Sequence, residues 1–239
     1  MENEITVIVP AAGAGRRFGS PEGKIFAVVR GLPLLAHTLK RLHREETVTE
    51  IIPVLRQEDA GRVFDMVREL NLCKIRRIAP GGRERQDSIY NALRLIEDGE
   101  AGRTRDMFIM VHDGARPVVP ENTLDDLLRE METADGAAPG IAARDTLKVV
   151  SEDGIVVSTL ERGRVRAIQT PQLFPFGIIK KAYDAAYTEG FYATDDAALV
   201  ERMGGRVKII AGSLLNIKVT TPEDIDLLEH ILSKEEGLP

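Results

Sequence analysis

Short apolar runs alternate with longer segments whose apolar residues recur at helical spacing, and this alternation constrains the fold more than any other feature. Residues 5–9 (ITVIV) and 107–111 (MFIMV) are nearly continuous apolar runs, which are typical of strands buried on both faces. Residues 34–42 and 89–96 instead carry their apolar side chains along one helical face. Strands and helices that alternate in this way predict an α/β fold with a mostly parallel sheet.

The rest of the chain continues the alternation. Further strands are predicted at residues 51–55, 75–78, 137–142 and 207–210, and further helices at 63–70, 124–131, near 175, near 195 and from 221. No linker and no internal repeat interrupts the pattern. We therefore expect a Rossmann-like, mostly parallel twisted sheet with helices on both faces, in a single domain over residues 1–239.

The alternation changes after residue 144. Residues 149–150 and 155–157 are β-branched runs on either side of an Asp153-Gly154 pair, which is the signal of a tight hairpin turn. We expect an inserted β-hairpin arm at about residues 144–168 that projects from the α/β body. Such an arm is suited to a dimer interface or to a lid.

Composition and charge exclude several classes of protein. The net charge is −6, whereas domains that bind duplex nucleic acid carry a basic excess. The single cysteine, Cys73, rules out an internal disulfide and a zinc site built from thiolates. No apolar run approaches the roughly 20 residues of a membrane span, and residues 1–4 do not resemble a secretory leader. We expect a cytoplasmic protein that binds neither nucleic acid nor membrane.

The first candidate for chemistry is the loop of residues 10–19 (PAAGAGRRFG), followed by Lys24. Its small residues come after a predicted strand and let backbone N–H groups approach a phosphate or a base closely. A dinucleotide-binding loop is excluded because Phe18 stands where the third glycine is required, and residues 19–25 do not match a P-loop. The alternative is a tight turn with exposed arginines.

Two more loops are candidates for the same site. Residues 79–88 (APGGRERQDS) run into a predicted helix, whose free N–H groups and Ser88 hydroxyl are available to a ligand, unless they form an ordinary cap. Asp113, within residues 111–117 (VHDGARP), follows a strand at the edge where ligands bind in such sheets. A carboxylate there suits Mg²⁺, and the alternative is a turn residue. His112 is expected to be structural.

Hydroxyl, amide and basic side chains also occur at residues 144–148, 170–172, 194–196 and 216–220, each near the end of an apolar run. Singly, each segment is explained as a cap or a turn. Together they offer the cations and hydroxyls that suit a phosphorylated polyol.

Taken in order, these segments resemble the 2-C-methyl-D-erythritol 4-phosphate cytidylyltransferase family, within the nucleotide-diphospho-sugar transferase superfamily. The resemblance runs from residue 5 to about residue 230 and so covers nearly the whole chain. It implies transfer of CMP from CTP to 2-C-methyl-D-erythritol 4-phosphate, with release of pyrophosphate, in non-mevalonate isoprenoid biosynthesis. Such chemistry needs positioning and charge neutralisation rather than a covalent nucleophile.

The resemblance also implies roles for individual residues. Those implied in catalysis, around the α-phosphate and the leaving pyrophosphate, are Arg17, Lys24 and Lys218. Those implied in nucleotide binding are Ala11, Ala12, Gly13, Gly82, Arg83, Ser88 and Gly114. Those implied in acceptor binding are Thr146, Arg162, Thr170, Thr194 and Lys218. The resemblance further implies Mg²⁺ held by Asp113, and a homodimer in which the β-arm carries Arg162 to the site of the other subunit.

Three positions depart from the family pattern. Gly114 replaces an alanine, and Arg83 replaces a carboxylate. Leu215 replaces an aspartate, so no carboxylate at that position can support Lys218 or the metal.

Two alternatives remain open. A ribitol-5-phosphate cytidylyltransferase has a similar fold and similar loops, although that family tends to carry a glycine directly before the Gln-Thr-Pro-Gln of residues 169–172. A catalytically inactive nucleotide-binding module is disfavoured, because the charged residues implied in catalysis and metal binding are all present.

Overall fold

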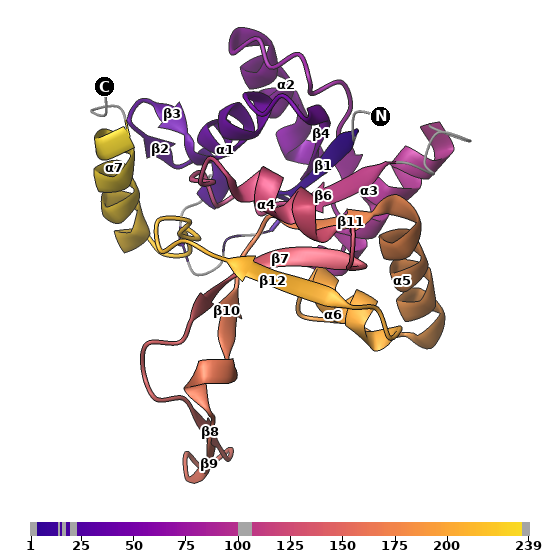
Figure 1. Ribbon diagram of the computed structural model, residues 1–239. Helices are drawn as coiled ribbons and strands as arrows, with labels where there is room; N and C mark the ends of the chain where they lie inside the picture. The colour runs from indigo at the N-terminus through magenta and orange to yellow at the C-terminus, as the bar shows by residue number, and fades with distance from the viewer. Residues whose placement is uncertain (1–3, 14, 16–17, 20–22, 100–106, 236–239) are drawn as a thin grey trace.

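The computed structural model describes residues 4–13, 15, 18–19, 23–99 and 107–235. A central sheet forms its core, and helices lie on both faces (Figure 1). The strands of this sheet are β1 (Ile5–Pro10), β4 (Val48–Leu55), β5 (Ala79–Pro80), β6 (Phe108–Val111), β7 (Gly136–Ala142), β10 (Arg166–Ile168), β11 (Gln172–Pro175) and β12 (Val207–Ala211). Their order is β10-β7-β11-β6-β1-β4-β5, and β12 pairs with β7 beside this path.

The pairing around β1 is parallel, as predicted. β1 pairs in parallel with β4 and with β6, and β12 pairs in parallel with β7. β11 runs antiparallel to both β6 and β7, and β10 runs antiparallel to β7. The mostly parallel α/β fold is therefore confirmed. β10 and β11 are only three and four residues long, too short to show a periodic pattern in the sequence.

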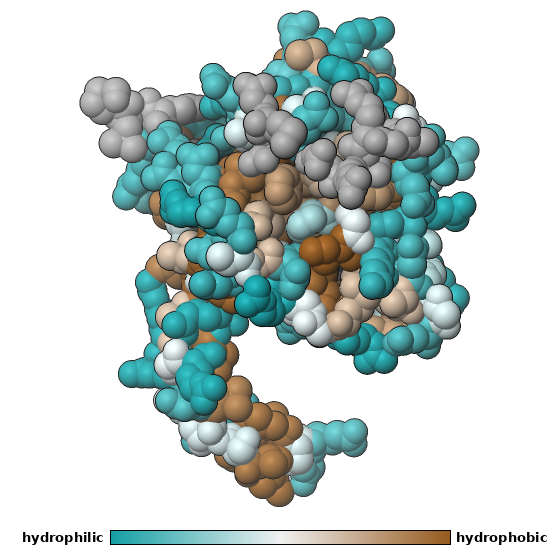
Figure 2. Space-filling view, turned by 45° about the vertical axis from the view of Figure 1, so that its right-hand side comes forward, coloured by the Kyte–Doolittle hydropathy of each residue, from teal (hydrophilic) through white to brown (hydrophobic). Residues whose placement is uncertain are grey.

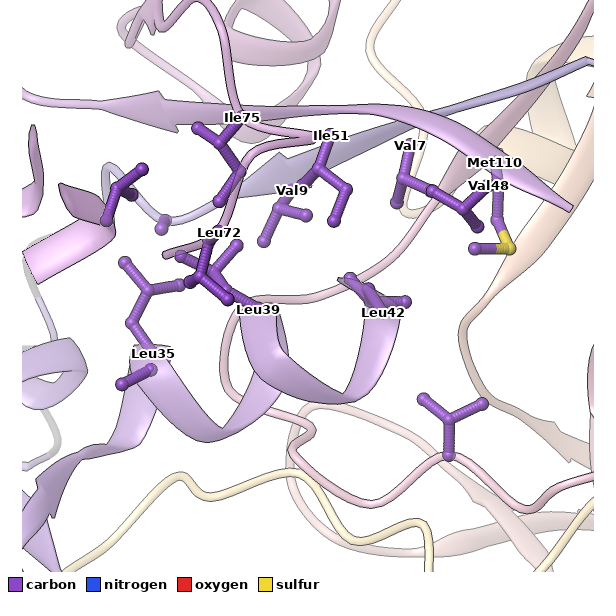
Figure 3. Close-up of a cluster of buried hydrophobic side chains, with 14 of the residues drawn as sticks. Val7, Val9, Leu35, Leu39, Leu42, Val48, Ile51, Leu72, Ile75 and Met110 are labelled. Carbon is purple, nitrogen blue, oxygen red and sulfur yellow. The ribbon is translucent and has the colours of Figure 1, made fainter. Parts of the chain in front are cut away.

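Successive side chains of β1 point into two separate hydrophobic cores. Val7 and Val9 belong to one core and Ile8 to the other, because neighbouring residues of a strand face opposite sides of the sheet. Leu35 and Leu39 pack toward the first core from their helix (Figure 3). The helices of this first core are α1 (Leu34–His43), α2 (Ala60–Glu69) and α4 (Thr123–Glu130). Those of the second core are α3 (Arg85–Gly99), α5 (Phe176–Glu189) and α6 (Asp196–Arg202).

The strand predicted at residues 75–78 is wrong. The chain reaches the sheet only at β5, where Ala79 lies opposite Val54 of β4. Ile75 is nevertheless buried in the first core, while the Arg77 guanidinium lies 2.7 Å from a carboxylate oxygen of Glu50. The apolar residues that suggest a strand thus pack as a loop against the edge of the sheet.

A third, smaller core forms where the last described helix packs beside a short hairpin from the N-terminal part of the chain. α7 (Glu223–Glu235) lies beside β2 (Val28–Val29), which forms a short hairpin with β3 (Leu32–Pro33). Val219 and Leu228 are fully buried in this core. The core fixes the segment just before α7, which contains Lys218, against the rest of the molecule.

The predicted hairpin is confirmed. β8 (Lys148–Val150) pairs antiparallel with β9 (Val156–Thr159), and these two strands form a sheet separate from the central one. This β-arm projects from the body, at the bottom of Figure 1. Val156 and Val157 are 54% and 66% exposed. Figure 2 shows apolar residues gathered along the end of the arm.

Among the residues that the structure describes, no helix has the length and apolar character needed to cross a membrane.

Candidate active site

A cavity of about 550 Å³ opens at the carboxyl ends of β1 and β6. This is the edge at which open α/β sheets bind ligands. The residues predicted from the sequence that line it are Ala11, Ala12, Gly13, Lys24, Gly82, Arg83, Ser88, Asp113, Gly114 and Lys218. Four segments far apart in the sequence thus meet around one cavity.

The other predicted residues lie elsewhere. Thr146 and Thr194 are exposed on loops, and Arg162 is exposed on the short helix η4 (Arg162–Arg164) of the arm. Thr170 is buried behind Asp113 and does not line the cavity. Arg17 lies outside the described residues.

The floor of the cavity is closely packed around Gly114. The Gly114 N–H donates to Pro10 O at 3.3 Å, and Thr38 Oγ1 donates to Gly114 O at 3.0 Å. A Cβ at this position would lie 3.1 Å from a methyl group of Leu35 and 3.2 Å from the Ala11 Cβ. The departure from alanine therefore relieves a tight contact beneath the cavity.

The loop before α3 is held by hydrogen bonds to the first turn of that helix. The Gly82 N–H donates to Ser88 Oγ at 2.9 Å, and that hydroxyl donates to Glu84 O at 3.1 Å. A Cβ at position 82 would lie 2.2 Å from the Asp87 Cβ, so glycine is required there. Ser88 Oγ keeps one lone pair that can accept a further hydrogen bond at the cavity wall.

Asp87 braces this loop from behind. Its Oδ2 accepts the Glu84 N–H at 2.8 Å, while its Oδ1 accepts hydrogen bonds from the hydroxyls of Tyr187 and Tyr192. Partial burial raises the pKa of Asp87, but the hydrogen bond from Tyr187 and those to the backbone outweigh it and lower the pKa below its usual value. The brace is therefore ionised at neutral pH.

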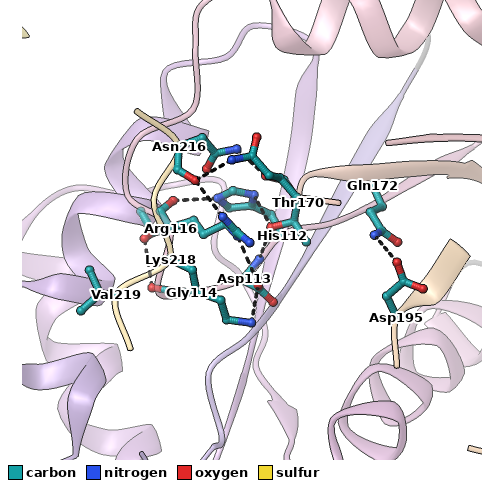
Figure 4. A network of polar contacts seen from close by, with 12 residues as sticks. His112, Asp113, Gly114, Arg116, Thr170, Gln172, Asp195, Asn216, Lys218 and Val219 are labelled. Carbon is teal, nitrogen blue, oxygen red and sulfur yellow. Dashed lines mark hydrogen bonds and ion pairs between the residues drawn. The ribbon is translucent and has the colours of Figure 1, made fainter. Parts of the chain in front are cut away.

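Three basic side chains surround the Asp113 carboxylate. Lys218 Nζ lies 2.8 Å from its Oδ2, Arg116 Nε 3.4 Å from the same oxygen, and Arg85 Nε 3.6 Å from Oδ1 (Figure 4 shows the first two). Burial raises the pKa of Asp113, but Arg85 and Lys218 outweigh burial and hold the pKa well below its usual range. Asp113 is thus a charged carboxylate at the cavity wall.

His112 supports Asp113 from the buried side, as expected for a structural histidine. Its Nε2 lies 2.8 Å from Arg116 O, and because a carbonyl only accepts, Nε2 carries the proton. Thr170 Oγ1 accepts the Asp113 N–H at 3.0 Å and donates to His112 Nδ1 at 3.1 Å. Burial lowers the pKa of His112 to about 4, so the imidazole is neutral at pH 7.

A second set of hydrogen bonds fixes the segment that carries Lys218. Asn216 Nδ2 donates to Thr170 O at 2.8 Å, and Arg116 Nη1 donates to Asn216 O at 2.7 Å (Figure 4). Lys24 Nζ donates to Val219 O at 2.8 Å. Lys24 is therefore anchored on the segment that carries Lys218, and both lysines line the cavity.

Sequence reasoning assigned no role to Arg85, Arg116 or Asn216. All three stand inside the segments that carry the family resemblance, so their position was the available signal. Apart from the contact of Arg116 with nearby Asp113, their partners lie far away in the sequence, and only the fold brings them together.

Comparison with known proteins agrees with the site. The family profile described as 2-C-methyl-D-erythritol 4-phosphate cytidylyltransferase (IspD) matches residues 5–234. A protein of that name from Syntrophus aciditrophicus is 41% identical, with 99% of each chain covered. Another of that name, from Bacillus mycoides, is 38% identical over 95% of this chain and 97% of the relative.

Solved structures lead to the same family. The 4-diphosphocytidyl-2C-methyl-D-erythritol synthase of Anaerococcus prevotii superposes with a TM-score of 0.82 at 27% identity, with 97% of each chain covered. The 2-C-methyl-D-erythritol 4-phosphate cytidylyltransferase of Francisella tularensis gives 0.78 at 29% identity, over 96% of this chain and 99% of that one. This chain belongs to the 2-C-methyl-D-erythritol 4-phosphate cytidylyltransferase family.

Proposed function

We propose that this chain transfers the cytidylyl group of CTP to the phosphate of 2-C-methyl-D-erythritol 4-phosphate and releases pyrophosphate, as a step of isoprenoid precursor biosynthesis. The observation that carries the proposal is the convergence of Lys24, Asp113 and Lys218 on one cavity, in a chain whose family is defined by this reaction. The names of the relatives favour this acceptor over ribitol 5-phosphate.

The reaction joins two anions. A phosphate oxygen of the acceptor forms a bond to the α-phosphorus of CTP, while the bond from that phosphorus to the β-phosphate oxygen breaks. The acceptor phosphate and the triphosphate of CTP repel each other. A site that holds them in line and neutralises their charge therefore lowers the activation barrier. Lys24 and Lys218 line the cavity and supply that charge, with Arg17 proposed to add to it from the first loop.

Cytosine recognition is proposed to rest on the loop before α3. The amino group of cytosine donates hydrogen bonds where uracil has an accepting oxygen. The free lone pair of Ser88 Oγ and the backbone of Gly82 and Arg83 face the cavity that would receive the base. Ala11, Ala12, Gly13 and Gly114 leave room for base and ribose against the backbone.

The donor set at Asp113 fits Mg²⁺ bound together with CTP. No group of three or more His, Cys, Asp or Glu side chains in the described ranges is arranged to hold a metal ion by itself. A single carboxylate that works with substrate phosphates is how proteins commonly hold Mg²⁺. A divalent cation bound there supplies charge neutralisation on the triphosphate oxygens.

The acceptor site is proposed to be completed by a second copy of the chain. Arg162 stands on the exposed arm, outside the cavity of its own chain, and the arm carries exposed apolar residues such as Val156 and Val157. A homodimer formed through the arms would cover these residues and bring Arg162 to the cavity of the other subunit. Thr146, Thr170 and Thr194 are proposed to line the acceptor site with Lys218.

Pyrophosphate release tests the proposed function. Purified protein with Mg²⁺ is given CTP and either 2-C-methyl-D-erythritol 4-phosphate or ribitol 5-phosphate, with ATP, GTP and UTP as nucleotide controls. Release that requires both CTP and the methylerythritol phosphate supports the proposal. Release only with ribitol 5-phosphate would transfer the assignment to that acceptor, and binding of CTP without any release would leave an inactive module.

A further inference from the structure

Arg85, the first residue of α3, lines the cavity without a role in the reaction described above. Its guanidinium reaches two carboxylates. Nη1 and Nη2 donate to the two oxygens of Asp196 at 3.2 and 2.7 Å, and Nε lies 3.6 Å from Asp113 Oδ1. A single side chain therefore connects the cavity wall to the start of α6.

The Asp196 end of this connection is rigid. Asp196 is fully buried, and its Oδ1 also accepts a hydrogen bond from the Tyr183 hydroxyl. Because a guanidinium is planar, two hydrogen bonds to one carboxylate fix its orientation as well as its position. The Arg85 Nε is thus presented to Asp113 in a fixed direction.

The Asp113 end is held asymmetrically. Lys218 and Arg116 both lie on its Oδ2 side, whereas Arg85 lies on its Oδ1 side. Removal of Arg85 would leave this carboxylate restrained from one side by its basic neighbours. A carboxylate that binds a metal with CTP must present its oxygens in a defined direction, and partners behind it set that direction.

The cost of burying charge also argues for a specific purpose. The Asp196 carboxylate is fully buried, whereas the Arg85 side chain is 31% exposed at the cavity. An ion pair whose carboxylate is removed from water is seldom a net source of stability compared with apolar packing. The contact that Arg85 makes with Asp113 at the cavity offers another reason for its presence.

We propose that Arg85 is a positioning residue: anchored on Asp196, it holds the Asp113 carboxylate in the orientation that receives a divalent cation together with CTP. This inference rests on the proposed function. It assigns Arg85 no contact with the acceptor and no bond-making step.

The test measures how tightly the protein binds Mn²⁺ in the presence of CTP and the absence of acceptor. The electron paramagnetic resonance signal of free Mn²⁺ reports the unbound fraction. Arg85→Lys keeps the charge, but a lysine cannot form the paired hydrogen bonds to Asp196 and reach Asp113 at the same time. It is expected to weaken Mn²⁺ binding about 10-fold or more. The steady-state counterpart is a higher Mg²⁺ concentration for half-maximal rate, with a smaller change in the KM for the acceptor.

Arg202→Lys is the matched control. Arg202 also forms two hydrogen bonds to a carboxylate, that of Glu189, but on the exposed surface of α5 and α6. It should leave Mn²⁺ binding unchanged. Asp196→Asn weakens the anchor while it keeps the shape of the side chain, and it should reproduce part of the loss of Mn²⁺ binding. It is the substitute variant in case Arg85→Lys folds poorly.

Folded Arg85→Lys or Asp196→Asn protein that binds Mn²⁺ as tightly as the wild type would overturn the proposal, since a purely structural bridge would affect stability alone. Mn²⁺ binding does not depend on turnover. A wild-type protein that binds Mn²⁺ with CTP but transfers nothing would therefore contradict the proposed function and leave the role of Arg85 to be judged by its own measurement.

Discussion

Lys218 Nζ lies 2.8 Å from Oδ2 of Asp113, although the two residues come from opposite halves of the chain. The contact joins the loop after β6 to the segment that precedes α7. The Lys218 side chain is 40% exposed, so its ammonium group stays accessible from the cavity. An arriving triphosphate can share this ammonium group with Asp113, which couples substrate binding to the arrangement of the site.

Replacement of Lys24 tests charge neutralisation at the cavity. Lys24→Ala removes an ammonium group that is fixed on Val219 O, and kcat should fall on the order of 100-fold, because a preorganised charge opposite a developing one is lost. Steady-state kinetics and a thermal unfolding curve measure the two effects separately. Lys181→Ala, on the exposed surface of α5, is the control. Full activity in Lys24→Ala would refute the assigned role.

Arg162 is expected to act on the acceptor. Arg162→Ala should raise the KM for 2-C-methyl-D-erythritol 4-phosphate at least about 10-fold, a loss typical of one charged hydrogen bond, and leave CTP affinity unchanged. Arg164→Ala removes a neighbouring exposed arginine of η4 and serves as the control. A collapse of CTP affinity in Arg162→Ala would show that the arm has been assigned to the wrong substrate.

Subunit mixing tests whether Arg162 works across a dimer. Lys24→Ala carries a defective cavity and an intact arm, whereas Arg162→Ala carries the reverse. A mixed dimer of the two variants has one complete site only if the arm serves the other subunit. Activity should therefore reappear when the two proteins are unfolded together and refolded, and a mixture that stays inactive argues that Arg162 acts within its own chain.

The exposed apolar residues of the arm predict the dimer itself. Val157→Asp places a charge on a side chain that is 66% exposed, and it should convert a dimer into a monomer in sedimentation velocity. Val28→Asp is the control, since Val28 is 65% exposed but lies outside the arm. A wild-type protein that sediments as a monomer at micromolar concentration contradicts the proposed assembly.

His112 predicts how stability changes with pH. Its pKa is about 4 when folded and near 6.5 when unfolded, so the unfolded chain takes up the proton first as the pH falls. This residue should therefore cost about 3 kcal/mol of stability between pH 6.5 and 4, with no such loss above pH 6.5. Urea unfolding without added metal measures it.

The matching variant is His112→Gln, whose stability should depend less on pH over that window, although its stability at pH 7 is lower. His230→Gln, at an exposed position of α7, should keep the pH dependence of the wild type. An identical slope in His112→Gln and the wild type would contradict the account of this buried histidine.

Elements with a strong pattern of their own could be predicted from the sequence. β1 and β6 lie in nearly continuous apolar runs, and the turn at Asp153-Gly154 marks the hairpin of the arm. The prediction at 75–78 fails because Ile75, which is buried, and Ile78, which is partly buried, pack against the core from a loop, and pairing with the sheet begins only at Ala79.

The candidate site likewise contains residues that could be predicted from the sequence and contacts that could not. Residues of the loops at strand ends, such as Gly82 and Asp113, could be placed from the sequence because the carboxyl edge of a sheet gathers them. The contact between Arg85 and Asp196 could not, because it depends on how the fold brings the start of α3 to the start of α6. The acceptor role of Thr170 remains a prediction, and its hydroxyl is hydrogen-bonded to His112 and Asp113.

The most direct test of the account follows the oxygen atom that forms the new bond. The acceptor is prepared with ¹⁸O in its phosphate oxygens and incubated with the protein, CTP and a divalent cation, and the products are separated and weighed by mass spectrometry. All of the label is expected to stay in the cytidylylated product, and none is expected to enter pyrophosphate. Unlabelled CMP as the main product, or label in pyrophosphate, would contradict transfer to the acceptor phosphate.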